Sequence, residues 1–488
     1  QAEDGIRDRS PSRGLGDVYK RQADDVPGGH TGLNQPPTPA TLPDASDTQT
    51  ASWPARLAQT TFALYLILLL GANGVASSQG PLSWLPLVQL PAAGNEWVGI
   101  GVVGLLPLLS AGAWLGQRAR QGRLRQLGWG SRRVVWPLLA LAGLGALSLV
   151  EQCPGSACSP AAAARLALLL AHLVWVYLYV VNERPHLFLI VAAIILLQSS
   201  VALGQFVFQR DLVLAWLGEP PLDRQLAGVS VVMRGAERWL RAYGLTNHPN
   251  ILAGTLAPLL LLLLVLARDL PSRQRRFLPP LFALGCAALF ATLARWAAVC
   301  FALGVGLNLL PWLADGLRRR RWTVAPWAAA LALAVGLAVG LMFVIYGDAV
   351  VGRAVALESP VESRSLWERG RDTEIAVHLL AERPLTGVGL GRYLTYARAL
   401  DRWAETVHNI PLLMGAELGL LGLLLWPVLL IVPVARRDAL SRHAPETALW
   451  LGFWLLGLLY PAPHPLLELR SALLVGLAAG RLAQPRAV

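Results

Sequence analysis

The sequence predicts an all-α, polytopic membrane protein with about twelve transmembrane helices and a long helical loop on the side opposite the cytoplasm. Hydrophobic residues make up 55% of the 488-residue chain and charged residues only 15%, and the mean hydropathy is +0.48. Apolar runs of roughly 20 residues, long enough to cross a hydrocarbon core about 30 Å thick, recur from about residue 56 to residue 482. Runs such as 251–267 are apolar on every face, which excludes the alternating pattern of a membrane β-barrel.

The N-terminal segment, residues 1–52, is rich in Pro, Gly, Asp and Thr and poor in hydrophobic residues, so we expect it to be disordered. Its opening stretch, through about Gln22, resembles a translated adaptor and is set aside. The first apolar run begins some fifty residues into the chain, and we expect it to be a retained helix of a membrane domain that covers residues 53–488.

The apolar runs place the expected helices at approximately 56–76, 97–116, 134–151, 162–182, 186–206, 250–267, 278–292, 295–314, 325–346, 408–434, 447–460 and 465–482. Arginine-rich short connections follow the second, sixth, eighth, tenth and last of these runs, and such connections stay in the cytoplasm. Both termini are therefore predicted to be cytoplasmic, and the long segments 207–249 and 347–407 to be outside. The same orientation puts Cys153 and Cys158 outside, where they can close a small disulfide.

The formal net charge of +12 comes from arginines between apolar runs, so it indicates membrane orientation and no nucleic-acid partner. The first outer segment is an exception to the expected depletion of arginine outside. On a helix, its Arg234, Arg238 and Arg241 would stand at i, i+4 and i+7 and form a cationic stripe for a polyanionic ligand. The alternative is an interfacial helix that lies on lipid headgroups.

Three outer helix starts carry residues suited to anion binding or proton transfer. Thr246, Asn247 or His248 can cap the sixth helix, which Pro249 opens, and its free N–H groups suit a phosphate. Arg295 begins the eighth helix and faces either a wet cleft or, as a snorkelling residue, the membrane boundary. His408 begins the tenth helix and is either a proton carrier or a polar cap.

Residues 230–435 resemble the O-antigen ligase and polymerase family, which transfers glycans from polyprenyl-pyrophosphate carriers on the periplasmic side of bacterial membranes. The matching pieces are R-x-x-G-x-x-x-x-P-N at 241–250, Arg295, E-R-P-L-T-G-V-G-L-G-R-Y at 382–393, and H-N followed by A-E-L-G-L-L-G at 408–422. The family often has Ser before the helix-start arginine, where this chain has Ala294. The resemblance implies that Arg241 and Arg295 hold the pyrophosphate and that His408 assists attack by the acceptor hydroxyl.

The loop 347–407 is predicted to hold an amphipathic helix that ends near Pro384 and covers the donor headgroup. Its Arg364 and Arg392 are phosphate or sugar candidates, unless they pair with nearby glutamates. Glu417, deep in the tenth helix, is expected to have a structural role, with a catalytic role as the alternative. The full set of expected substrate contacts is Arg234, Arg238, His248, Asn250, Arg364, Arg392 and Asn409.

The predicted function is metal-independent, inverting transfer of a glycan from a polyprenyl-pyrophosphate donor to a glycan or lipid acceptor, as a ligase or polymerase of envelope polysaccharide or lipopolysaccharide. No cofactor is expected, since the acidic pair Asp372 and Glu374 does not lie on an early outer loop. One alternative is a solute transporter, such as a bicarbonate-transport-related protein, because ionisable residues fall within the membrane: His172, Glu417, Glu468 and Arg470. The other is a noncatalytic envelope assembly protein.

Overall fold

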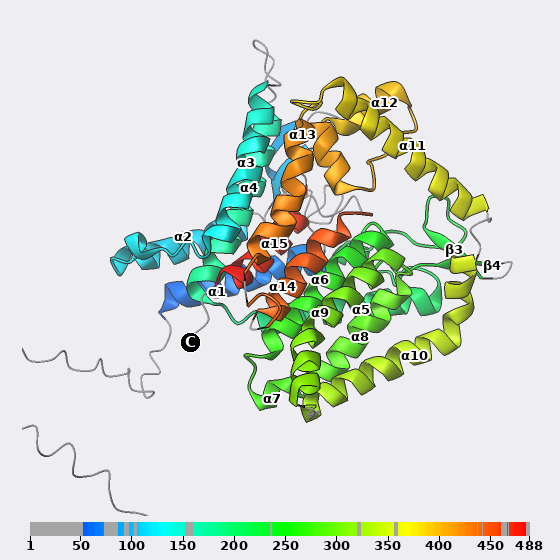
Figure 1. The fold of residues 1–488 in the computed structure, drawn as a ribbon, viewed down its shortest axis with the longest axis horizontal. Coiled ribbons are helices and arrows are strands. Elements are labelled where there is room, and N and C mark those ends of the chain that lie inside the picture. Colours follow the sequence, from blue (N-terminus) through cyan, green and yellow to red (C-terminus); the bar gives the residue numbers. More distant parts are fainter. Residues whose placement is uncertain are drawn as a thin grey trace, which may run out of the picture. The chain divides into compact units, whose positions relative to one another are not determined.

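A computed structural model describes residues 52–72, 86–91, 97–101, 105–151, 160–234, 237–319, 324–355, 360–436, 438–441, 443–459, 466 and 468–484, which are mostly helical (Figure 1). The N-terminal segment 1–51 and the predicted disulfide between Cys153 and Cys158 lie outside these residues.

Eight described helical segments are long and apolar enough to cross a membrane. They are Trp53–Gly71, Arg132–Val150, Ala163–Glu183, Leu187–Phe208, Pro249–Ala267, Arg295–Arg319, Pro326–Val350 and Ile410–Val434. The other expected spans contain shorter helices: α2 (Leu105–Arg120), α8 (Leu278–Ala291), α14 (Ala444–Leu456) and α15 (Leu469–Ala483). With at most 16 residues each, they rise about 24 Å or less, short of the roughly 30 Å core. The predicted count of about twelve therefore becomes eight in the described chain by this criterion.

Two small antiparallel hairpins depart from the predicted all-α fold. β1 (Pro86–Pro91) pairs with β2 (Trp97–Gly101), so the span expected at 97–116 begins as a strand. β3 (Val231–Arg234) pairs with β4 (Glu237–Leu240) in the first long connection.

The first two helices pack against each other, whereas α4 packs against the last helix. α1 (Trp53–Leu66) continues as the π-helical turn η1 (Ile67–Gly71) and lies against α2, where the Ser110 hydroxyl donates to the carbonyl of Ala58 at 2.8 Å. α3 (Arg132–Glu151) is followed by α4 (Pro160–Glu183), which packs along α15. Small residues allow this close packing, since a Cβ at Gly480 would lie 2.7 Å from Val180.

The centre of the described bundle is α6 (Pro249–Ala267), which contacts α5 (Leu187–Phe208), α8, α9 (Arg295–Arg319) and α14 (Figure 1). Its span is 78% buried, whereas that of α10 (Pro326–Val355) is only 6% buried. A helix that is apolar on every side must be covered by protein or by lipid. α6 is covered by its neighbours, whereas most of α10 is uncovered by the described protein, as expected for a helix that faces lipid.

The connection between α10 and α13 (Ile410–Ile431) contains α11 (Pro360–Glu382) and α12 (Tyr393–Leu400), which pack beside α13. α11 ends just before Pro384, as the sequence predicts, but α10 continues to Val355, past its expected end at 346. The remaining short turns are η4 (Leu124–Gln126), η5 (Ala215–Leu217), α7 (Ser272–Arg275) and η7 (Val432–Val434).

Candidate functional site

The cationic stripe predicted from Arg234, Arg238 and Arg241 is wrong, because these residues belong to a hairpin and its exit. Arg234 pairs with Glu237 across the strands, and Arg238 pairs with Met233. Adjacent strand residues point to opposite faces, so Arg234 and Arg238 lie on different faces of the hairpin. Val231, Val232 and Trp239 are strong strand formers, and they outweigh the helical spacing of the arginines.

Arg234 fastens β3 to the end of α10. Its Nε donates to Asp348 Oδ2 at 2.5 Å, and its guanidinium lies over the Trp239 ring at 4.7 Å. The Nε of Arg238 is buried and has no hydrogen-bond partner in the described part of the chain.

Arg241 is buried, with 4% of its surface exposed, and three neutral acceptors hold its guanidinium. Its Nε donates to the carbonyl of Thr292 at 2.8 Å. Its Nη1 and Nη2 donate to Ser230 Oγ at 2.8 Å and Asn250 Oδ1 at 2.7 Å. Arg241 therefore joins three segments: the hairpin approach, the start of α6 and the turn that leads into α9.

The start of α6 is capped by His248, one of the three residues predicted to cap it. The His248 Nδ1 accepts the N–H of Asn250 at 3.1 Å, and Pro249 is the first helical residue. The Thr246 hydroxyl instead donates to the carbonyl of Tyr243 at 2.7 Å and supports the preceding turn. His248 and Asn250, both expected substrate contacts, thus also shape the helix start.

The starts of α9 and α13 meet at one end of α14. Arg295 is the first residue of α9, and its side chain is exposed. The next residue, Trp296, donates from its indole N–H to the carbonyl of Leu455 at 2.9 Å. The N–H of Ile410, the first residue of α13, donates to the carbonyl of Gly457 at 2.7 Å. Arg241, Arg295 and His408 are thereby brought to the same end of the helix bundle.

His408 lies two residues before α13, and its neighbour Asn409 caps that helix by accepting the N–H of Leu412 at 2.8 Å. The His408 Nδ1 is buried and has no hydrogen-bond partner among the residues that the structure describes. Burial and, to a smaller extent, the charge of Arg369 lower the pKa of His408 to about 4, although Asp372 and Glu368 oppose the shift. The imidazole is therefore neutral at pH 7 and able to accept a proton.

Arg369 of α11 was not anticipated from the sequence. Its guanidinium is half-buried, acts electrostatically on His408, and makes no hydrogen bond or ion pair with the other described residues. Arg364, the predicted candidate one helix turn and a half earlier, is 79% exposed and pairs with Glu368 at 2.8 Å. The structure thus agrees with the alternative given for Arg364, in which this arginine pairs with a glutamate on the same helix.

A buried network holds the segment before His408 against α11. Asp372 is 1% exposed and accepts Arg371 Nη2 at 2.8 Å and the N–H of Glu405 at 3.3 Å. The Tyr393 hydroxyl donates to the Asp372 carbonyl at 3.0 Å, and burial raises the pKa of this phenol, which keeps it a donor. Asp372 therefore positions the segment that leads to His408. The described residues contain no cluster of three or more His, Cys, Asp or Glu arranged for a metal.

α13 is interrupted at Gly419, which has φ 73° and ψ −167°. The interruption leaves backbone groups unpaired, and such groups are costly in lipid. Residues 384–389 supply partners: Leu420 N–H donates to Pro384 O at 2.7 Å, and Val388 and Gly389 N–H donate to Ala416 O and Glu417 O at 2.8 and 2.9 Å. The glycine-rich motif at 382–393 thus fits into a broken helix.

Two glycines are required where this segment meets α13. A Cβ at Gly387 would lie 2.4 Å from the backbone carbon of Glu417, and one at Gly419 would lie 2.4 Å from the carbonyl oxygen of Leu385. Both residues also have positive φ, which non-glycine residues rarely adopt.

Glu417, whose backbone carbonyl takes part in this contact, is only 2% exposed. Its Oε1 accepts the N–H of Tyr393 at 3.2 Å, at the start of α12, while its Oε2 has no hydrogen-bond partner among the described residues. Glu417 thereby fixes the position of the turn that carries Arg392.

Arg392 and Arg383 both lie over the ring of Tyr396, at 5.8 and 5.2 Å from its centroid. Neither guanidinium pairs with a carboxylate in the described structure. Two cations on one aromatic ring form a surface suited to an anion or a sugar. Arg392 was predicted, whereas Arg383 and Tyr396 were not, although Arg383 lies in the E-R-P-L-T-G motif.

The ionisable residues that favoured a transporter have local partners. His172 Nδ1 lies 2.6 Å from the carbonyl of Leu168, and Arg470 pairs with Glu468 at 3.7 Å. The Ser471 hydroxyl also donates to Glu468, at 2.8 Å.

A family model described as O-antigen ligase matches residues 280–426. The chain carries an O-antigen ligase domain. This domain and the apolar helices indicate a bacterial membrane protein with a glycan-transfer function. No curated protein matches the chain. The O-antigen ligase domain contains Arg295, the segment 382–393 and His408, whereas Arg241 precedes it and joins it through Thr292.

Proposed function

We propose that the protein transfers a glycan from a polyprenyl-pyrophosphate carrier to an acceptor hydroxyl at the extracytoplasmic face, as an O-antigen ligase or polymerase. The observation that carries this proposal is the meeting of three helix starts with an exposed arginine, Arg295, and a neutral histidine, His408. Helix starts and guanidinium groups both favour phosphate. A polyanionic headgroup beside a proton acceptor is what glycan transfer from pyrophosphate requires.

The two arginines have different roles in this proposal. Arg295 is exposed at the start of α9 and contacts the pyrophosphate directly. Arg241 is buried and hydrogen-bonded to Thr292 and Asn250, so it holds the starts of α6 and α9 together. Its positive charge acts on the pyrophosphate from inside the protein, without direct contact. Arg369, Arg383 and Arg392 contribute further positive charge on the α11–α12 side.

In the reaction, the acceptor oxygen forms a bond to the anomeric carbon while the bond from that carbon to the pyrophosphate breaks. The bonding electrons leave with the polyprenyl pyrophosphate, the hydroxyl proton passes to His408, and attack from the opposite face inverts the carbon. Pyrophosphate is a good leaving group, so stabilisation of its charge by fixed cations does most of the work, without a metal.

The low pKa of His408 suits this sequence of events. In the free protein, burial and Arg369 keep the imidazole neutral. When the pyrophosphate binds, its negative charge offsets the arginine and raises the pKa of His408 toward the pH of the medium. The histidine then becomes a better proton acceptor only with the donor in place.

The test uses purified protein in lipid nanodiscs, a polyprenyl-pyrophosphate glycan and candidate acceptors, with released polyprenyl pyrophosphate and product linkage read by mass spectrometry. Wild type should turn over in the presence of EDTA, and His408→Ala and Arg295→Ala should lose at least 100-fold in kcat, on the order expected for loss of a proton acceptor or a charge-stabilising donor.

Arg319→Ala is the matched control for Arg295→Ala, because it removes an exposed arginine from the opposite end of the same helix, where Arg319 pairs with Asp315. This control should retain wild-type turnover. Absence of turnover, together with solute flux into vesicles, would overturn the enzyme assignment.

A further inference from the structure

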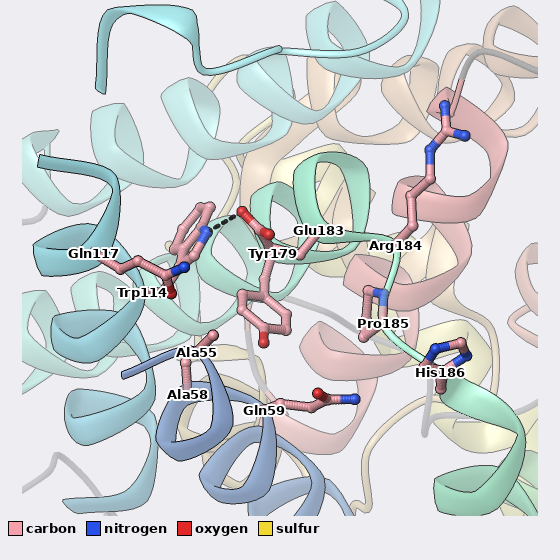
Figure 2. Close-up of a pocket in the computed structure, with 10 residues that line it drawn as sticks. All are labelled: Ala55, Ala58, Gln59, Trp114, Gln117, Tyr179, Glu183, Arg184, Pro185 and His186. Atoms are coloured by element: carbon pink, nitrogen blue, oxygen red, sulfur yellow. Dashed lines mark hydrogen bonds between the residues drawn. The ribbon is translucent and has the colours of Figure 1, made fainter. Parts of the chain in front are cut away.

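A polar cavity of about 190 Å³ lies between the start of α1, the end of α2 and the turn from α4 to α5 (Figure 2). A water molecule needs only roughly 10–15 Å³ of such space, so the cavity accommodates a group of several heavy atoms. Three candidate spans begin or end here, at Trp53, Glu183 and Leu187. The cavity therefore lies at the level of the lipid headgroups.

This cavity is separate from the glycan-transfer site. Near the far end of α5, Gln205 Nε2 donates to the carbonyl of Gly244 at 2.9 Å, close to Arg241. The cavity is at the other end of α5, beside His186. Since α5 has 22 residues, the two ends are about 33 Å apart, the thickness of a bilayer core.

The cavity wall offers hydrogen-bonding groups that the protein itself does not use. Four lining side chains make no hydrogen bond with other described residues: Gln59, Gln117, Tyr179 and His186. Gln59 extends toward His186, and Arg184 points away from the others (Figure 2). Among the described residues, no side chain caps the start of α5, so its first N–H groups remain available near His186.

One wall of the cavity carries the carboxylate of an ion pair between Glu183 and Arg118. Glu183 Oε1 accepts the indole N–H of Trp114 at 2.6 Å and Arg118 Nε at 2.8 Å, which holds the carboxylate in place. Its Oε2 makes no hydrogen bond with the described residues. The Tyr179 ring lies 5.4 Å from the Trp114 ring at 81°, so two aromatic rings flank the carboxylate. A carboxylate with aromatic neighbours suits an ammonium group.

We propose that this cavity binds the headgroup of a phospholipid that carries a primary ammonium, the phosphatidylethanolamine class. The ammonium pairs with Glu183 beside Trp114 and Tyr179. The phosphate meets His186, the Gln59 amide and the free N–H groups that start α5. The acyl chains continue into the bilayer between the candidate spans.

The test is native mass spectrometry of the full-length protein released from nanodiscs of equal phosphatidylethanolamine and phosphatidylglycerol. Wild type should retain one more phosphatidylethanolamine molecule than each of the two variants, Glu183→Gln and Gln59→Leu, does. Gln59 makes no hydrogen bond with described residues, so Gln59→Leu gives a result even where Glu183→Gln disturbs Trp114 and Arg118. The control Gln121→Leu, an exposed residue after α2 outside the cavity, should retain lipid as wild type does.

The choice of lipid separates the ammonium from the phosphate. Phosphatidylcholine, whose ammonium has no N–H, and phosphatidylglycerol, which has no ammonium, should each be retained at least fivefold less than phosphatidylethanolamine, and inorganic phosphate should not displace the bound lipid. Equal retention by wild type and Gln59→Leu, or equal retention of phosphatidylglycerol, would overturn the proposal. Neither measurement depends on glycan transfer.

Discussion

At the scale of single residues, the environment of His408 is set by charges on α11. Burial and Arg369 lower the pKa of the imidazole to about 4, while Glu368 and Asp372 raise it. Because the pKa of His408 is lower in the folded protein than in the unfolded chain, protonation favours unfolding. The free energy of unfolding therefore keeps the full contribution of His408 above about pH 6.5, the unfolded value, and loses it as the pH falls toward 4.

Replacing the charges on α11 should move the acid limb of the pH–rate profile in opposite directions. In Arg369→Gln, the pKa of free His408 rises from about 4 toward 6.5, so kcat/KM falls at a higher pH than in wild type. In Glu368→Gln, a carboxylate that raises the pKa is lost, and the limb moves to lower pH. The measurement is kcat/KM from pH 3.5 to 8, and two shifts of the same sign would contradict this account.

Arg241 should contribute to stability as well as to chemistry. Arg241→Lys keeps the charge but cannot reach Thr292 O, Ser230 Oγ and Asn250 Oδ1 together, which leaves buried acceptors unsatisfied. We expect a loss of about 1–3 kcal/mol in the free energy of unfolding, measured as a lower Tm in detergent. Arg238→Lys is the control, because Arg238 makes no hydrogen bond with described residues; an equal drop in both variants would refute the role given to Arg241.

Some of these residues could be found in the sequence and others could not. His248 stands directly before Pro249 and an apolar run, a local pattern that predicts a helix cap. Arg369 is separated from His408 by a whole helix and two turns, and only the folding of the 401–408 segment onto α11 brings the two side chains together. Motifs reveal local roles, whereas a charge that acts across elements has no sequence signature.

At the scale of elements, hydropathy predicted the apolar run of α13 but not its interruption. An average of hydropathy over the run counts Gly419 as one more small residue, although the backbone of Gly419 is not helical. The hairpin β3–β4 shows the opposite error, since three arginines at helical spacing suggested a helix while valines and a tryptophan form short strands.

Substituting Gly387 should disrupt the fit of residues 384–389 into α13. In Gly387→Ala, the Cβ meets the Glu417 backbone and φ stays at 66°, so we expect a loss of at least about 2 kcal/mol, with less folded protein by size-exclusion fluorescence.

Gly370→Ala in α11 is the matched control for this substitution. A Cβ there meets nothing within 4 Å, and alanine favours the helix by roughly 0.5–1 kcal/mol. Tm should rise slightly or stay unchanged. Similar losses in both variants would indicate a general sensitivity to substitution instead of a specific contact.

At the scale of the whole molecule, the orientation rests on arginine placement and can be measured directly. In a Cys153→Ser, Cys158→Ser background, the remaining Cys286 and Cys300 are buried. Gly370→Cys on α11 should react with a membrane-impermeant maleimide on intact spheroplasts, whereas Gln121→Cys should react only after the membrane is opened. Labelling of both, or neither, before permeabilisation would invalidate the orientation.

The sequence predicts about twelve spans, whereas eight helices in the described part of the chain have the length and hydropathy of a span, because composition does not determine helix length. α8, α14 and α15 are as apolar as true spans, but each ends after 13–15 residues. These helices complete the packing around α4, α6 and α9.

The interruption of α13 also bears on how this protein is assembled. The stretches before and after Gly419, residues 410–418 and 420–431, rise about 14 and 18 Å, so neither crosses the bilayer alone. While α13 enters the membrane, an open break would expose amides to hydrocarbon. Residues 384–389 are synthesised before α13, so the backbone groups at the break can pair with a segment that already exists when α13 is made.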